Sequence, residues 1–125
     1  MKIIIDVAAS MCTHEKGGIS YLMDDFLSTL RCMDKRNEYI IFGHFWRDYK
    51  EKVKRITLPE TENFRIKTLK LPGVAVNFIE EKLKLPFLEH FFRKEKIDIF
   101  HAISGDKLPF LKKMKTVLTI HDLAF

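Results

Sequence analysis

A histidine and an aspartate near the end of the chain are the residues best placed to do chemistry. His121 and Asp122 follow the run TVLTI at 116–120, which is apolar at nearly every position and rich in β-branched residues. This pattern is typical of a parallel strand covered on both faces. Ligands of open parallel sheets bind at the carboxyl ends of the strands. We therefore expect His121 to emerge there and hydrogen-bond a sugar hydroxyl or a carbonyl, unless it is a structural histidine, while Asp122 caps the next helix or orients the loop.

A glycine pair, Gly17 and Gly18, follows the first apolar run and precedes an amphipathic segment. Glycine permits close approach, so the backbone amides and the positive end of a helix could face a phosphate or a sugar hydroxyl. The neighbouring Lys16 would then help to neutralise the anion, or would lie in solvent. The spacing is neither GxGxxG nor the Walker pattern, so a tight loop without a ligand remains the alternative.

Two further polar residues stand near the ends of predicted strands. His101 lies in IDIFHAI and Asp6 in KIIIDV, so these ends could converge with that of His121, and His101 is a candidate for substrate binding. A metal site would gather His14 with these groups, but no HxH or HExxH spacing places two ligands on one element, and we predict no metal. No serine lies in a GxSxG elbow, so covalent catalysis is unsupported.

The elements that must position these residues alternate along the chain. Short apolar runs indicate strands, and apolar residues spaced three and four apart indicate helices. The order strand, glycine turn, helix opens a doubly wound α/β domain, so we predict a Rossmann-like, mainly parallel sheet with flanking helices. The expected strands cover 2–7, 39–43, 64–71, 97–103 and 116–120, and the expected helices cover 19–30 and two stretches within 76–96 separated by Pro86.

The remaining segments are less regular. The imperfect alternation of 64–71 favours a position near a sheet edge. We expect a short helix or loop within 44–63, and at most one or two helical turns within 109–114.

Length and composition predict one domain in a reducing compartment. The chain has 125 residues, 46% of them hydrophobic, which allows one core and is too short for two ordinary domains. Its two cysteines lack CxxC spacing and are too few for a disulfide framework. With no signal peptide and no apolar run of about 18 residues, we expect a cytoplasmic protein.

The charge favours anionic partners only modestly. There are 22 Lys and Arg against 17 Asp and Glu, a formal net charge of +5, and we expect no nucleic-acid partner. Much of the positive charge lies in 47–55 and 93–96. These stretches are either solvated helix faces or a surface for anionic lipid headgroups, with Phe91 and Phe92 as the apolar part of an interfacial helix on the inner face of the membrane.

The motifs KIIIDV, GGIS, NEYIIFG, DIFHAISGDKLP and KTVLTIHDLAF, in this order, resemble the amino-terminal domain of bacterial GT-B-fold glycosyltransferases of family four. The likeness covers most of the chain and is weak over 44–88. It implies transfer of a hexose, with retention, from a nucleotide diphosphate sugar to a glycan or lipid-linked acceptor of cell-surface polysaccharide synthesis. It implies no metal or other cofactor.

The resemblance also implies roles for individual residues. Gly17 and Gly18 would form the loop beside the donor diphosphate and the acceptor, and His121 would be the catalytic histidine that reaches the donor sugar. Asp122 would complete the family's HD pair in a mainly structural role. The nucleotide and an EX7E motif belong to a carboxyl-terminal domain that this sequence does not contain, so we expect 1–125 to be an acceptor-side domain, inactive alone. The alternative is a non-catalytic α/β module that binds a nucleotide or a membrane surface.

Overall fold

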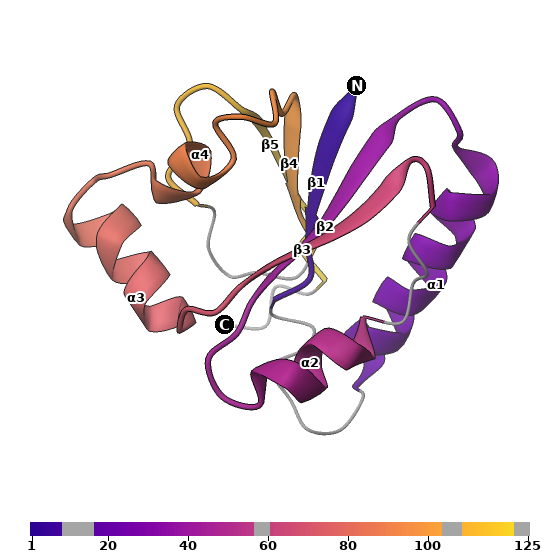
Figure 1. Ribbon diagram of the computed structural model, residues 1–125, viewed down its shortest axis with the longest axis horizontal. Coiled ribbons are helices and arrows are strands. Elements are labelled where there is room, and N and C mark those ends of the chain that lie inside the picture. Colours follow the sequence, from indigo (N-terminus) through magenta and orange to yellow (C-terminus); the bar gives the residue numbers. More distant parts are fainter. Residues whose placement is uncertain (9–16, 57–60, 104–108, 122–125) are drawn as a thin grey trace.

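The computed structural model describes residues 1–8, 17–56, 61–103 and 109–121, and its central feature is a five-stranded sheet. Every pair of neighbouring strands is parallel, in the order β3-β2-β1-β4-β5 (Figure 1). This is the predicted doubly wound α/β architecture. The strands are β1 (Lys2–Asp6), β2 (Glu38–His44), β3 (Phe64–Leu69), β4 (Ile99–Ala102) and β5 (Lys115–Leu118).

Strand β1 lies at the centre of the sheet and is the point where the strand order reverses. Ile4 lies opposite Ile40 of β2 on one side and opposite Phe100 of β4 on the other. Both Ile4 and Ile5 are buried, because successive side chains of a strand point to opposite faces and here both faces are covered. The three consecutive isoleucines are therefore explained by a central parallel strand, as predicted.

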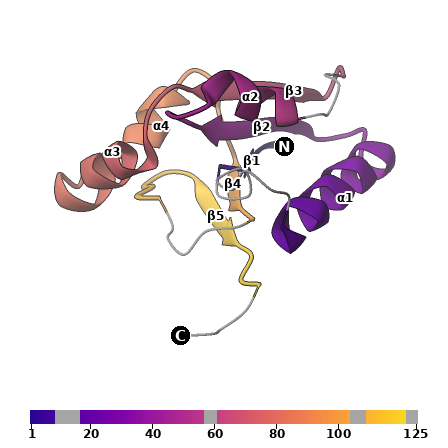
Figure 2. The same ribbon diagram turned by 90° about the horizontal axis from the view of Figure 1, so that it is seen from below.

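Helices cover both faces of the sheet (Figures 1 and 2). One side, the α1 face, carries α1 (Gly18–Met33) and α2 (Tyr49–Arg55). The opposite side, the α4 face, carries α3 (Gly73–Asn77), the π-helical turn η2 (Phe78–Lys82) and α4 (Phe87–Phe91). Pro86 precedes α4 and separates it from the helical stretch before it, as its missing N–H predicts.

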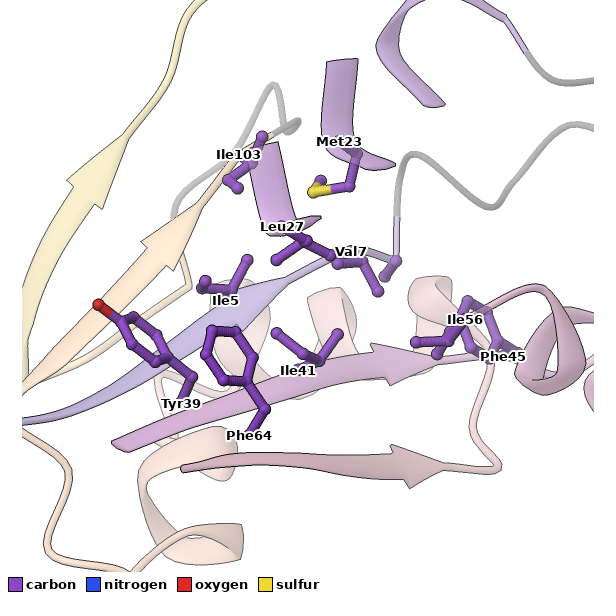
Figure 3. Packing of buried hydrophobic residues seen from close by; sticks show 11 residues of the cluster. Ile5, Val7, Met23, Leu27, Tyr39, Ile41, Phe45, Ile56, Phe64 and Ile103 are labelled. Atoms are coloured by element: carbon purple, nitrogen blue, oxygen red, sulfur yellow. The ribbon is translucent and has the colours of Figure 1, made fainter. Parts of the chain in front are cut away.

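The alternation of strand side chains divides the core into two clusters. On the α1 face, Met23 and Leu27 of α1 are fully covered and belong to the same cluster as Ile5 of β1 (Figure 3). On the α4 face, the rings of Phe42 and Phe92 meet edge to face at 5.0 Å. Complete burial of one such side chain contributes about 1.5–3 kcal/mol, so these contacts hold the two layers to the sheet.

Strand β5 differs from the expectation that both of its faces are covered. It is an edge strand that pairs only with β4, and Val117 is 43% exposed. It also ends at Leu118, so that Ile120 lies beyond it and is 62% exposed. An apolar run indicates that a strand can be buried but does not determine its place in the sheet order. The predicted edge position of β3 is confirmed, and 109–114 contain no helix in their described part.

The interpretation of Phe91 and Phe92 as the apolar side of an interfacial helix is wrong. Phe92 is 1% exposed, and Phe91 packs against the same buried cluster. Both rings are therefore used by the core of the α4 face. Among the described residues, no helix combines the length and the apolar character that a membrane crossing requires.

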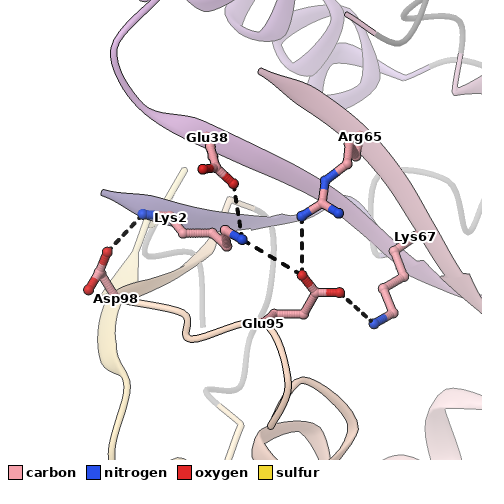
Figure 4. Close-up of polar contacts among 6 residues, drawn as sticks. All are labelled: Lys2, Glu38, Arg65, Lys67, Glu95 and Asp98. Atoms are coloured by element: carbon pink, nitrogen blue, oxygen red, sulfur yellow. Dashed lines mark hydrogen bonds and ion pairs between the residues drawn. The ribbon is translucent and has the colours of Figure 1, made fainter. Parts of the chain in front are cut away.

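An ion-pair network ties the amino ends of three strands together (Figure 4). Glu95 accepts a hydrogen bond from Arg65 Nη2 at 3.1 Å and one from Lys67 Nζ at 3.2 Å, both from β3. Its carboxylate also lies 3.9 Å from Lys2 Nζ of β1, which pairs with Glu38 of β2 at 3.0 Å. Partial burial raises the pKa of the Glu95 carboxyl, whereas Lys67 and Arg65 lower it. The two cations together have the larger effect, so the pKa of Glu95 is below its ordinary value.

Replacing Glu95 by glutamine tests this network. A lowered folded-state pKa stabilises the protein above the unfolded-state value of about 4.3, and this stabilisation is lost as the pH falls toward the folded-state pKa. We expect Glu95→Gln to lower the free energy of unfolding by about 1 kcal/mol at neutral pH and by much less in acid, measured by urea denaturation. The exposed Glu62→Gln is the control, and an equal effect of both variants at neutral pH would contradict the network.

Candidate functional site

The order of the strands reverses beside β1, so the chain connections diverge at the carboxyl ends of β1 and β4. The helix that follows β1 in the chain lies on the α1 face, whereas the connection from β4 to β5 packs Leu111 and Met114 on the α4 face. A sheet whose connections diverge in this way binds its ligands at the point of divergence. His101, His121 and the start of α1 lie at this edge, whereas Lys16 and Asp122 are outside the described residues.

His121 links the last two strands at this edge. Its Nε2 lies 2.6 Å from the carbonyl oxygen of Ile103, the residue that follows β4. A carbonyl can only accept, so Nε2 carries the proton and donates, and Nδ1 is the ring nitrogen left for a ligand. The neutral ring can therefore accept a hydrogen bond at Nδ1, and only the protonated ring can donate one there. The residue is exposed, so this nitrogen can meet a ligand.

His101 lies beside His121 on the α1 face. Its Nε2 is 2.9 Å from Thr119 Oγ1, and its ring meets Phe26 of α1 edge to face at 6.0 Å. Burial lowers the pKa of His101, so the ring is neutral at physiological pH. The two histidines thus hold the ends of β4 and β5 together, one through a hydroxyl group and the other through a carbonyl group.

The structure does not bring Asp6 to these histidines. Ile5 of β1 lies opposite His101, whereas Asp6 lies opposite Ala102. Because neighbouring positions of a strand face opposite sides, His101 points to the α1 face and Asp6 points to the α4 face. The strand ends converge as predicted, but their polar side chains divide between the two faces.

On the α4 face Asp6 belongs to a group of ionisable residues that sequence reasoning missed, the Asp6 cluster, made of Asp6, His44 and Glu80. Glu80 is 3% exposed, and its two carboxylate oxygens accept the backbone N–H groups of Leu88 and Phe110 at 3.0 and 3.1 Å. Burial raises the pKa of Glu80, and Asp6 raises it further. Burial also raises the pKa of Asp6, whereas the Ala8 N–H and His44 lower it.

His44 completes the Asp6 cluster at the end of β2. Its Nδ1 is buried and has no hydrogen-bond partner within the described part of the chain. A Cβ atom at Gly73 would lie 3.2 Å from His44 Cε1, so the glycine at the start of α3 leaves room for the ring. No sequence signal identifies Glu80, which stands in a charged stretch of an apparent surface helix, whereas in the structure it lies in the π-helical turn η2 and is buried.

Burial therefore favours the protonated forms of the Asp6 and Glu80 carboxyl groups relative to exposed carboxyl groups. Among the described residues, no three His, Cys, Asp or Glu side chains are grouped so as to hold a metal ion.

The glycine pair opens onto free space. Gly17 precedes α1 with φ −90°, which any residue can adopt, and a Cβ atom added at Gly17 or Gly18 would have no described heavy atom within 4 Å. No side chain of the described residues caps this helix end. Within the described residues, neither packing nor backbone conformation therefore explains the two glycines.

Protein-family models, curated proteins and solved structures were all compared with the chain, and none of them matches.

Substituting Asp6 by asparagine tests the burial of its charge. A raised folded-state pKa means that the folded protein binds the proton more tightly, so stability is highest below the unfolded-state value of about 3.9 and falls as the pH rises toward the folded-state pKa. The asparagine side chain cannot ionise but can still accept from the Ala8 N–H. We expect Asp6→Asn to raise the free energy of unfolding by about 1 kcal/mol at neutral pH and to change it little in acid.

Asp25 on α1 is exposed, so Asp25→Asn is the matched control. It should leave the pH dependence of the free energy of unfolding unchanged. The free energy of unfolding is measured by urea denaturation across the acid range. If it varied with pH in Asp6→Asn as it does in the unsubstituted protein, a desolvated Asp6 would be contradicted.

Proposed function

We propose that this chain is the acceptor-side domain of a retaining glycosyltransferase, which moves a hexose from a nucleotide diphosphate sugar to a hydroxyl group of a glycan or lipid-linked acceptor. One observation carries the proposal. An exposed His121 and the glycine pair at the start of α1 stand at the carboxyl edge of one parallel sheet, where its order reverses.

The chemistry of the reaction fits these groups. The leaving diphosphate gains negative charge in the transition state, and helix amides with the positive end of a helix dipole stabilise such charge. The open space at Gly17 and Gly18 lets a diphosphate approach the backbone of α1. Nδ1 of His121 would contact a hydroxyl of the donor sugar, with the ring orientation maintained by the Ile103 carbonyl.

We propose that activity requires a second, carboxyl-terminal domain that holds the nucleotide. Retaining transfer needs the donor and the acceptor held in line and away from water, which an open half-cleft cannot do. Apolar side chains exposed on α1, in β5 and just after β5 support a covering partner on this side of the sheet, since such residues are usually shielded. They are Ile19, Leu22, Phe26, Val117 and Ile120, between 36% and 62% exposed.

A location in the cytoplasm with peripheral attachment to anionic membranes is the second part of the proposal. Its support is the exposed basic group Arg93, Lys94 and Lys96. Since Phe91 and Phe92 pack into the core, such attachment rests on charge and weakens with salt.

Substitution of His121 tests the proposed mechanism. In the complete protein as its source cell makes it, His121→Ala should lower hexosyl transfer from a UDP- or GDP-hexose by about 100-fold or more. His121→Gln keeps a donor for the Ile103 carbonyl but has no counterpart of Nδ1, so we expect it to be as inactive as alanine. Activity restored by glutamine would assign His121 a positioning role, and full activity of both variants with nucleotide binding intact would favour a non-catalytic module.

Gly18→Ala separates ligand contact from packing. The added methyl group meets no described atom, and alanine is favoured over glycine in helices by about 0.5–1 kcal/mol, so the free energy of unfolding should stay level or rise. Transfer should fall about tenfold or more if a diphosphate occupies that space. Thr29→Ala, an exposed site on the same helix, should leave transfer unchanged, and unchanged transfer in Gly18→Ala would remove the glycines from the site.

A further inference from the structure

A hollow of about 450 Å³ lies at the opposite edge of the sheet from the candidate site. One wall is α4 with the turn that leads into β4, and the other is the segment that leads into β5. Both walls precede their strands, so the hollow is at the amino ends of β4 and β5, and Figure 1 shows α4 beside this end of the two strands. Its volume is within the range of about 300–1,000 Å³ typical of small-molecule pockets.

The rim of this hollow, the basic rim, consists of Arg93, Lys96, Lys112 and Lys113. All four residues are exposed, and within the described part of the chain none of them forms an ion pair with a carboxylate. The cations of the neighbouring network differ, because Arg65 and Lys67 each form an ion pair with Glu95. The basic rim therefore keeps its positive charge available for an external anion.

The only carboxylate that lines the described hollow, Glu89, is already bound. Its Oε1 accepts the backbone N–H groups of Lys112, Lys113 and Met114, the last at 3.3 Å. Successive N–H groups that converge on one oxygen form a concavity suited to an anion. These hydrogen bonds offset part of the Glu89 charge, so the hollow remains positive overall, and His90 adds a further donor at its lining.

The floor of the hollow is apolar. Pro86, Phe92, Ile97 and Met114 line it, and all four belong to or adjoin the buried layer of the α4 face. A ligand that matched both parts would carry an anionic group for the rim and a short hydrocarbon portion for the floor.

We propose that this hollow binds the phosphate group of an amphiphilic phosphate ester. Phosphate suits the basic rim because Arg93 offers a planar pair of donors and the lysines offer compact charges. The proposal does not depend on glycosyl transfer, since it involves neither His121 nor the glycine pair. Two sources share this chemistry, a soluble phosphate ester and a phospholipid headgroup.

Titration of the protein with hexyl phosphate and with inorganic phosphate, followed by NMR chemical shifts, tests the site. We expect hexyl phosphate to bind more tightly and to shift the amide signals of 112–114. The double variant Lys112→Gln with Lys113→Gln should lose about tenfold in affinity, because it removes two charges from the rim and leaves the backbone contacts of Glu89 in place.

The matched control removes two positive charges from a surface far from the hollow. Lys50→Gln with Lys54→Gln on α2, across the sheet, should alter affinity by less than about twofold. Equal losses in the two double variants, or no binding of hexyl phosphate by the unsubstituted protein, would overturn the proposal.

Glu89→Gln should increase the affinity for hexyl phosphate, whereas the lysine substitutions should decrease it. Its amide oxygen can still accept the three N–H groups, while the negative charge beside the ligand is gone. We expect affinity for hexyl phosphate to rise about threefold to tenfold with an unchanged melting temperature. Unchanged or weaker binding in a folded variant would place the phosphate outside the hollow.

Vesicle sedimentation distinguishes the two sources. Binding to phosphatidylglycerol but not phosphatidylcholine vesicles, lost in the Lys112→Gln and Lys113→Gln variant, identifies a phospholipid headgroup. Binding of hexyl phosphate without sedimentation identifies a soluble ester. Sedimentation that both double variants retain would overturn the hollow as the lipid contact.

Discussion

The structure depends on the parallel pairing of β1 with a strand on each side. A parallel strand at the centre of a sheet needs cover on both faces, and β1 meets this need with isoleucines that serve two separate cores. Right-handed crossovers then carry α1 and α2 to one face and α3, η2 and α4 to the other. The reversal of strand order beside β1 is a direct result of this arrangement.

This division into two faces also governs the polar chemistry at the carboxyl edge. His101 and His121 join the ends of β4 and β5, with His101 on the α1 face, whereas Asp6 points into a buried acidic group on the α4 face. Burying Asp6 and Glu80 costs stability at neutral pH, because desolvation disfavours their charged forms. Proteins commonly retain such costs where a function needs them, which is consistent with a working site at this edge.

The two edges of the sheet have different electrostatic characters. At the amino edge Glu95 pairs with cations of β1 and β3, while the basic rim beside α4 has no carboxylate partner within the described residues. The carboxyl edge instead has helix amides, neutral imidazole and desolvated carboxyls. The proposed sites for a sugar diphosphate and for an amphiphilic phosphate therefore use separate parts of one domain, with the sheet between them.

The sequence by itself determined the fold class, the central β1, the long amphipathic α1, the break at Pro86 and the placement of His121 after the last strand, because each depends on local periodicity or backbone chemistry. Only the tertiary structure decided that β5 is an exposed edge strand, since strand order is a property of long-range pairing. It also decided that Asp6 and His101 face opposite sides, which depends on register, and that Phe92 is core. Glu80 and His44 were beyond sequence reasoning because their surroundings come from distant parts of the chain: Glu80 accepts the N–H of Phe110, and the His44 ring lies beside Gly73.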